Sequence, residues 1–189
     1  MNFLKSLDLT ILTFINHLPH NEVLVGIAKF FTNIGSGGFI WFCLAFGFLI
    51  AGGRKGARVC ILIVSGLVVD FILNELLVKH LVDRARPYHS GLIGLNFWDT
   101  KWTDASFFSG HAFSSFLCAY VVGRYYPKTF WPLMILATLI SFSRVYLAAH
   151  WPSDVIVGGA LGLVAGYIII LTDKRYSSGN SKIKNQRSK

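Results

Sequence analysis

The sequence contains few charged residues and very few acidic ones. Asp, Glu, Lys and Arg make up 14% of its 189 residues, and only nine residues are Asp or Glu. The charges lie in clumps between long apolar runs, whereas the helices of a water-soluble protein alternate charged and apolar positions. Together with 53% hydrophobic residues and a mean hydropathy of +0.54, this pattern excludes an ordinary soluble domain and indicates an integral membrane protein.

Cysteine is scarce as well. The three cysteines, Cys43, Cys60 and Cys118, lie within or at the ends of apolar runs. They show no CxxC spacing and have no companion histidines at the intervals typical of metal ligands. We therefore interpret them as small core residues and predict neither a disulfide framework nor a metal site.

The net charge of +9 could indicate a nucleic-acid partner, but its distribution argues against one. Eleven of the 18 Lys and Arg residues lie in three short segments between or after apolar runs, namely 52–58, 124–128 and 173–189. Membrane proteins keep basic segments of this kind on the cytoplasmic side. We therefore predict no nucleic-acid partner and place the C-terminus in the cytoplasm.

Five apolar runs are each close to the roughly 20 residues that a helix needs to cross a membrane. They cover residues 37–51, 59–78, 107–122, 131–149 and 154–172. We expect an all-α fold, a polytopic membrane helix bundle. Residues 1–172 would form a single membrane domain, and residues 173–189 a basic, disordered cytoplasmic tail. Threading the spans back from that tail places all three basic segments in the cytoplasm.

The first 36 residues are less regular. The apolar run at residues 3–18 is short, contains Asp8 and ends in the helix-breaking sequence HLPHN. It has no small-residue cleavage site, so we do not expect a cleaved signal peptide. The run is either a sixth span or an amphipathic helix at the membrane surface, and we favour a sixth span.

The same threading places a group of polar residues at the outer membrane face. Lys79 ends the second of the five spans, residues 109–111 begin the third, Arg144 and His150 end the fourth, and Asp154 begins the fifth. Cations are depleted on the outer face of membrane proteins, and ionisable residues within membranes usually serve a function. We therefore expect a functional site built from residues 79–87, 108–111 and 143–154.

These segments contain groups that could bind and hydrolyse a phosphate ester or diphosphate without a metal. Lys79, Arg86 and Arg144 would bind the non-bridging oxygens, because the planar Arg fork matches phosphate bidentately and Lys acts as a point charge. Ser109 is a good helix N-cap, and the first amides of that helix would face the same anion. Gly110 would allow the backbone to approach closely.

Two histidines and one carboxylate would carry the reaction. His150 would attack phosphorus as a neutral imidazole, with Asp154 fixing its tautomer and stabilising the charge that develops. His111 would protonate the departing oxygen and then activate water. Pro152 suits the first turn of the last helix, which leaves His150 just before that helix and Asp154 within its first turn.

These segments also make the sequence similar to a known family. It resembles the type 2 phosphatidic acid phosphatase superfamily, whose pattern is K-x6-RP, then PSGH, then SR-x5-H-x3-D. The matching residues are Lys79, Arg86 and Pro87, then Ser109, Gly110 and His111, then Ser143, Arg144, His150 and Asp154. Phe108 replaces the proline of the second block, which bears on how that turn is stiffened. The resemblance implies that the second-block histidine is the general acid, that the third-block histidine forms a phosphohistidine, and that no metal or other cofactor is needed.

The resemblance and the outward site together suggest a membrane lipid phosphatase. We expect undecaprenyl diphosphate as the substrate and undecaprenyl phosphate as the product, because the chain is small and similar to compact bacterial members of the family. The site would lie at the extracytoplasmic face of the plasma membrane. Phosphatidylglycerophosphate or phosphatidic acid phosphatase, and a lipid phosphotransferase, are alternatives. A non-catalytic transporter of anionic lipids belongs to a different class and would not need an aligned acid and nucleophile.

Other residues have more local interpretations. We predict Glu75 to be an ion partner of Lys79 or Arg86, and Asp83 and Arg84 to be a solvated pair. Phe97, Trp98, Trp102 and Phe107 would form an aromatic belt at headgroup level or a lid over the site. Gly158, Gly162 and Gly166 recur every four residues. Such a stripe suits a homo-oligomer or close packing within the bundle, and we favour the latter.

Overall fold

The computed structural model describes residues 3–92, 95–100 and 103–187, with side chains up to residue 174. Helices are the regular elements of these residues. The long ones are α1 (Phe3–Asn16), α2 (Glu22–Gly35), α3 (Phe39–Ala51), α4 (Gly53–Asp70), α6 (Gly110–Tyr125), α7 (Phe130–Tyr146) and α8 (Pro152–Arg187). A wide helical segment, η2 (Phe71–Val78), joins α4 to the short α5 (Lys79–Val82). Three single turns complete the set, η1 (Ser36–Gly38), η3 (Pro87–His89) and η4 (Pro127–Thr129). The expected all-α fold is confirmed.

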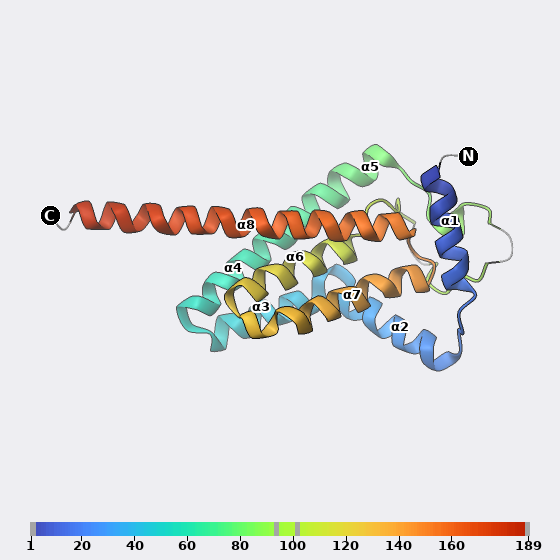
Figure 1. The fold of residues 1–189 in the computed structure, drawn as a ribbon, viewed down its shortest axis with the longest axis horizontal. Coiled ribbons are helices and arrows are strands. Elements are labelled where there is room, and N and C mark those ends of the chain that lie inside the picture. Colours follow the sequence, from blue (N-terminus) through green and yellow to red (C-terminus); the bar gives the residue numbers. More distant parts are fainter. Residues whose placement is uncertain (1–2, 93–94, 101–102, 188–189) are drawn as a thin grey trace.

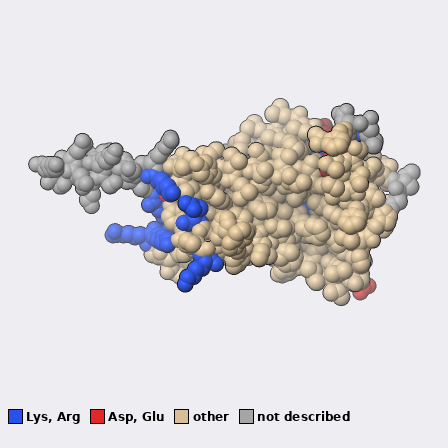
Figure 2. Space-filling model, viewed as in Figure 1, with Lys and Arg blue, Asp and Glu red and all other residues tan. Residues whose placement is uncertain are grey.

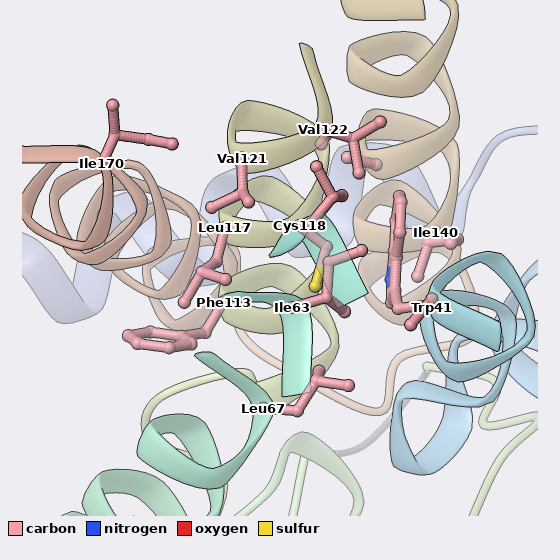
Figure 3. Close-up of a cluster of buried hydrophobic side chains, with 14 of the residues drawn as sticks. Trp41, Ile63, Leu67, Phe113, Leu117, Cys118, Val121, Val122, Ile140 and Ile170 are labelled. Carbon is pink, nitrogen blue, oxygen red and sulfur yellow. The ribbon is translucent and has the colours of Figure 1, made fainter. Parts of the chain in front are cut away.

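Helix α6 occupies the centre of the bundle and contacts α4, α7 and α8. Its side chains are buried on most sides, and Phe113, Leu117, Cys118 and Val121 belong to the main hydrophobic core, where Ile63 of α4 lies beside Cys118 (Figure 3). A polar contact also lies in this core, because Trp41 of α3 donates its indole N–H to Ser115 Oγ at 3.1 Å. Helix α6 is thus shielded from lipid by the helices around it.

Glycines let α8 lie directly against α6. A Cβ at Gly162 would lie 2.3 Å from the carbonyl oxygen of Phe113, and one at Gly158 would lie 2.6 Å from that of Ser109. These close neighbours are backbone atoms that cannot rotate away, so only glycine fits at the crossing. The small-residue stripe therefore packs within the bundle, as we expected, and this packing brings the start of α8 to the start of α6.

Among the residues that the structure describes, four helical stretches are long and apolar enough to cross a membrane, by length and composition: Glu22–Ala51, Gly53–His89, Pro127–Tyr146 and Pro152–Lys174. The first combines α2 and α3 across a bend at Gly37 and Gly38, both of which have positive φ. The expected span at 107–122 corresponds to α6, whose 16 residues begin only at Gly110. The structure thus supports a bundle of spanning helices, while the total of five or six is still a prediction.

Helix α1 lies across one end of the bundle instead of along it (Figure 1). Its 14 residues span about 21 Å at the rise of an α-helix, which is less than the roughly 30 Å of a hydrocarbon core. Length and direction both favour the interfacial helix over the sixth span that we preferred from the sequence. The sequence pattern could not decide this, because a short apolar run suits either location.

The surface has a basic end and a broad uncharged belt. In the face shown in Figure 2, Lys and Arg side chains gather near the residues where α8 leaves the bundle, and most of the remaining surface carries no charge. Many large apolar side chains are exposed along this belt, among them Phe46, Ile50, Ile61, Phe71 and Ile156. A surface of this kind is typical of a protein whose solvent is lipid.

Helix α8 does not end at residue 172, where we expected the membrane domain to stop and a disordered tail to begin. It continues to Arg187. The first tail residues are held by the bundle, since Arg58 of α4 donates to the Asp173 carboxylate at 2.7 Å and the Tyr125 hydroxyl also donates to it. These contacts hold the residue just past the predicted boundary, and the division into a membrane domain and a cytoplasmic tail stays a prediction.

Candidate active site

A cavity of about 620 Å³ lies between α2, α4, α6 and α7. Its lining includes six of the eight residues expected to bind or transform phosphate: Lys79, Arg86, Gly110, His111, Arg144 and His150. Ser109 and Asp154 are fully buried just behind the cavity wall. Segments that are up to 75 residues apart in the sequence thus converge on one site, as the charge pattern predicted.

His150 lies in the short connection between α7 and α8. Helix α7 ends at Tyr146, Ala148 takes a positive φ of 54°, and Pro152 begins α8. The His150 Nδ1 atom lies 3.6 Å from Oδ2 of Asp154, and that oxygen also accepts the Trp151 backbone N–H at 3.0 Å. Asp154 is therefore fixed by its own helix start and faces the imidazole from behind.

The His150 side chain is 2% exposed, and this burial lowers the pKa of the imidazole well below its ordinary value of 6.5. The positive charges of Arg86, Arg144 and Lys79 lower the pKa further. The ring is therefore neutral at physiological pH. A proton on Nδ1, toward Asp154, leaves the Nε2 lone pair directed at the cavity.

Arg86 lies beside that lone pair. Its Nη1 atom is 3.1 Å from His150 Nε2 and donates to the Ala149 carbonyl at 2.9 Å. Its Nε and Nη2 atoms donate to the backbone and side chain of Asp104, each at 2.9 Å. A guanidinium held from several sides is well placed to bind an anion next to His150.

Lys79 begins α5, at the end of the wide η2 segment. Its ammonium group pairs with Glu75, one turn earlier, and with Asp104. The predicted ion partner Glu75 is confirmed. Asp104 was not predicted, and because it contacts both Lys79 and Arg86 it joins two cations of the first sequence block.

Arg144 is 1% exposed and lies in the last turn of α7, six residues before His150 in the sequence. A cation at this depth needs a partner of opposite charge. The structure shows a carboxylate, since Nη1 donates to Asp99 Oδ2 at 2.7 Å. Thr32 of α2 lies 3.4 Å from the same nitrogen.

The second sequence block forms the start of α6. Ser109 is the N-cap, and its side chain accepts the Ala112 N–H at 3.5 Å. With its amide oriented to satisfy both contacts, Asn74 accepts the Gly110 N–H and donates to the Phe108 carbonyl, each at 3.1 Å. A Cβ at Gly110 would lie 2.6 Å from the Asn74 amide. Asn74 thus stiffens the turn in which Phe108 replaces proline, and it binds an amide that we had expected to face the anion.

His111 is held by α2. Its Nε2 atom lies 3.2 Å from the Thr32 carbonyl oxygen and 3.3 Å from Ser36 Oγ. The carbonyl can only accept, so the contact favours a proton on Nε2. The ring also lines the cavity, which places a second histidine at the site.

The loop before α6 covers the site. Trp98 stacks on His20 at a ring separation of 3.9 Å, and His20 stacks in turn on Tyr146 at 4.0 Å. This stack anchors the loop that carries Asp99, next to the Arg144 side chain. The aromatic belt or lid that the sequence suggested stays a prediction, and Trp102 lies outside the described residues.

Sequence reasoning missed the carboxylates of the site and misassigned one cation. Asp99 and Asp104 are the only acidic residues of the loop at 89–107, which is the signal that could have identified them. We predicted that Arg84 pairs with Asp83, and this was wrong. Arg84 instead donates to Asp154 Oδ1 and to Asp8 Oδ2, each at 2.6 Å. Among the residues that the structure describes, no three His, Cys, Asp or Glu side chains converge to hold a metal ion.

Comparisons with known proteins show which family the chain belongs to. The family model of the PAP2 superfamily matches residues 57–177. An undecaprenyl-diphosphatase from Sulfolobus acidocaldarius is 31% identical over 148 residues, which cover 77% of this chain and 69% of that protein.

Two solved structures share the fold. A transmembrane PAP2-type phosphatidylglycerolphosphate phosphatase from Bacillus subtilis has a TM-score of 0.71 at 22% identity, over 93% of this chain and 88% of its own. LpxE from Aquifex aeolicus has a TM-score of 0.72 at 27% identity, over 87% of this chain and 94% of its own. The apolar helices and these membrane relatives identify an integral membrane protein. The family model covers well over half of the chain, so the protein belongs to the PAP2 superfamily.

Proposed function

We propose that this protein removes the terminal phosphate from a lipid diphosphate, most plainly undecaprenyl diphosphate, through a phosphohistidine at His150 and without a metal. The carrying observation is that one cavity joins the two histidines and three cations to an apolar wall of Phe42, Leu67, Val68 and Phe71. Phe42, Val68 and Phe71 are also about half exposed on the apolar surface. A lipid could thus keep its tail in the bilayer while its phosphate enters the polar end.

Substrate binding rests on the cations. Lys79, Arg86 and Arg144 would bind the non-bridging oxygens of the terminal phosphate, and their charge would stabilise the transition state. In the structure these cations contact Asp99, Asp104 and Glu75, so the phosphate would share or replace these carboxylate contacts.

The first chemical step forms the phosphoenzyme. His150 Nε2 attacks phosphorus, the bond from phosphorus to the leaving lipid oxygen breaks, and protonated His111 gives its proton to that oxygen. Asp154, which faces Nδ1, stabilises the positive imidazole. In the second step His111 takes a proton from water, the water oxygen bonds to phosphorus, and the bond to Nε2 breaks to release inorganic phosphate.

The substrate assignment rests on likeness and chemistry. The relative from S. acidocaldarius is named an undecaprenyl-diphosphatase. The runner-up is a phosphatidylglycerophosphate or phosphatidic acid phosphatase, and a phosphotransferase would capture the same phosphohistidine with another alcohol. Phosphate release from each lipid in detergent separates the substrates, and equal rates would contradict the narrow assignment. An added lipid or sugar acceptor that becomes phosphorylated would reveal transfer.

His150→Ala tests the mechanism. We expect turnover to disappear while the variant stays folded and still binds lipid phosphate, whereas undiminished turnover would overturn the phosphohistidine. His111→Ala should also lose turnover, with some phosphoenzyme accumulating, because a departing lipid phosphate is a weak base that needs the proton of His111 less than the attacking water needs a base. A non-catalytic lipid transporter would show no difference between the wild type and either variant in phosphate release.

The proposed orientation has the site outside and the C-terminus in the cytoplasm. The basic segments support it, since they cluster at the end opposite the site (Figures 1 and 2). A C-terminal epitope tag should be protected from protease in intact spheroplasts and cleaved only after lysis. Cleavage before lysis would reverse the assignment.

A further inference from the structure

Helix α1 brings a buried carboxylate to the rear of the candidate active site. Asp8 is 3% exposed. Its Oδ1 atom accepts the Ser153 N–H at 2.8 Å, and its Oδ2 atom accepts the Ser153 hydroxyl at 2.6 Å. Asp8 therefore binds the first turn of α8, one residue before Asp154.

Arg84 links Asp8 to Asp154. One terminal nitrogen donates to Asp8 at 2.6 Å, and the other donates to Asp154 Oδ1 at 2.6 Å and to Ser153 Oγ at 2.8 Å. The guanidinium also lies over the Trp151 ring, 5.1 Å from its centroid. Since Asp154 presents its other oxygen to His150, the chain of contacts runs from α1 to the catalytic imidazole.

We propose that Asp8 and Arg84 are positioning residues, and that helix α1 holds the Asp154 carboxylate against His150. The inference rests on the proposed role of His150 and extends it to a segment outside the three sequence blocks. Arg84 alone would neutralise Asp154. Asp8 balances Arg84, so that the negative charge of Asp154 is available to the imidazole when it becomes positive.

The balance of charge predicts opposite effects for the two residues. Charged or titratable groups face His150 from every neighbouring element, namely Lys79 of α5, Arg86 of the following loop, His111 of α6, Arg144 of α7 and Asp154 of α8. Asp8→Asn removes one negative charge behind this set, and Arg84→Gln removes one positive charge. The first change disfavours the imidazolium and the second favours it.

The test is the pH profile of kcat/KM with one lipid substrate. Asp8→Asn should shift the acidic limb to lower pH, and Arg84→Gln should shift it to higher pH, each by about half a pH unit. Both variants should lose about tenfold in kcat with KM within about twofold of the wild type. Asp8→Glu should recover part of the loss. Ionisation of the substrate is common to all profiles and cannot produce opposite shifts.

Leu12→Ala is the matched control, because Leu12 is a fully buried residue of α1 that packs on Val145, Ala148 and Trp151 without carrying charge. It should lower the thermal unfolding midpoint and leave the acidic limb in place. Asp8→Asn that behaves like Leu12→Ala would overturn the inference, even if Arg84→Gln does not fold. Turnover by His150→Ala would instead contradict the proposed function, whatever Asp8→Asn does.

Discussion

The Asp104 carboxylate accepts a hydrogen bond from Arg86 at 2.9 Å, on a cation that we expect to bind the substrate phosphate. Asp104 also contacts Lys79, so one side chain of the covering loop occupies two cations of the site. Burial raises the pKa of Asp104, but the hydrogen bond from Lys79 and the charge of Arg86 lower it more, and the net shift is downward. The carboxylate is therefore ionised wherever the pH is above its ordinary value of 3.8.

The first prediction is that Asp104→Asn strengthens anion binding. Phosphate competes with the Asp104 carboxylate for Lys79 and Arg86, and a partly exposed ion pair is worth about 1 kcal/mol. The inhibition constant of inorganic phosphate should fall about fivefold. Asp83→Asn is the control, because Asp83 is an exposed carboxylate between Lys79 and Arg86 in the sequence. This substitution should leave the inhibition constant unchanged. Weaker phosphate inhibition in Asp104→Asn would show that Asp104 organises the cations instead of competing for them.

The second prediction concerns the shape of the Arg86 side chain. Arg86 contacts His150, Ala149 and Asp104 through three different nitrogens. Lysine keeps the charge and loses the planar fork, so Arg86→Lys should lower kcat/KM by about a hundredfold. Steady-state kinetics with the preferred lipid measure this, and circular dichroism checks the fold. A loss of less than about threefold would mean that charge alone suffices at this position.

The sequence predicted the residues of the site better than their partners. One cavity is lined by Lys79, Arg86, His111, Arg144 and His150, because each lies near the same end of the helix bundle. The order of the apolar runs in the sequence determines which end that is. The partners Asp99, Asp104 and Asp8 come from a loop and from α1, whose paths depend on long-range contacts. Spacing along the chain carries no information on such paths.

The same limit explains the differences in the fold. Asp8 interrupts an apolar run, and from the sequence it could lie at a membrane surface or inside a protein. The structure shows that it binds Arg84 and Ser153, which draws α1 across the end of the bundle. Asp173 likewise looks like the first residue of a charged tail, but it pairs with Arg58 of α4 and is thereby held against the bundle.

The third prediction is the pH dependence of activity. The pKa of His150 is lowered well below 6.5, first by burial and then by the charges of Arg86, Arg144 and Lys79. In the proposed mechanism the neutral ring is the nucleophile, so activity should be lost only as the pH falls through this lowered pKa. The rate of phosphoenzyme formation can be followed with a labelled substrate between pH 4 and 8 in steps of about half a unit. Protonation of His150 should cause no loss of this rate between pH 7 and 6. An NMR titration of the His150 ring with a midpoint at or above 6.5 would contradict the prediction.

The fourth prediction concerns the contact between α6 and α8. A Cβ at Gly158 would lie 2.6 Å from the Ser109 carbonyl oxygen and 3.3 Å from its nitrogen, and that nitrogen donates to the Asp154 carbonyl at 3.0 Å. Gly158→Ala should therefore separate Ser109 from Asp154, destabilise the protein by about 1–3 kcal/mol and lower kcat/KM. Gly47→Ala is the matched control on α3, because a Cβ there has nothing within 4 Å and alanine favours a helix by about 1 kcal/mol. Thermal unfolding and activity of the two variants in the same detergent measure the difference. Equal stability of the two variants would show that α6 and α8 can separate without cost. The packing of α8 on α6 would then not position the Asp154 carboxylate.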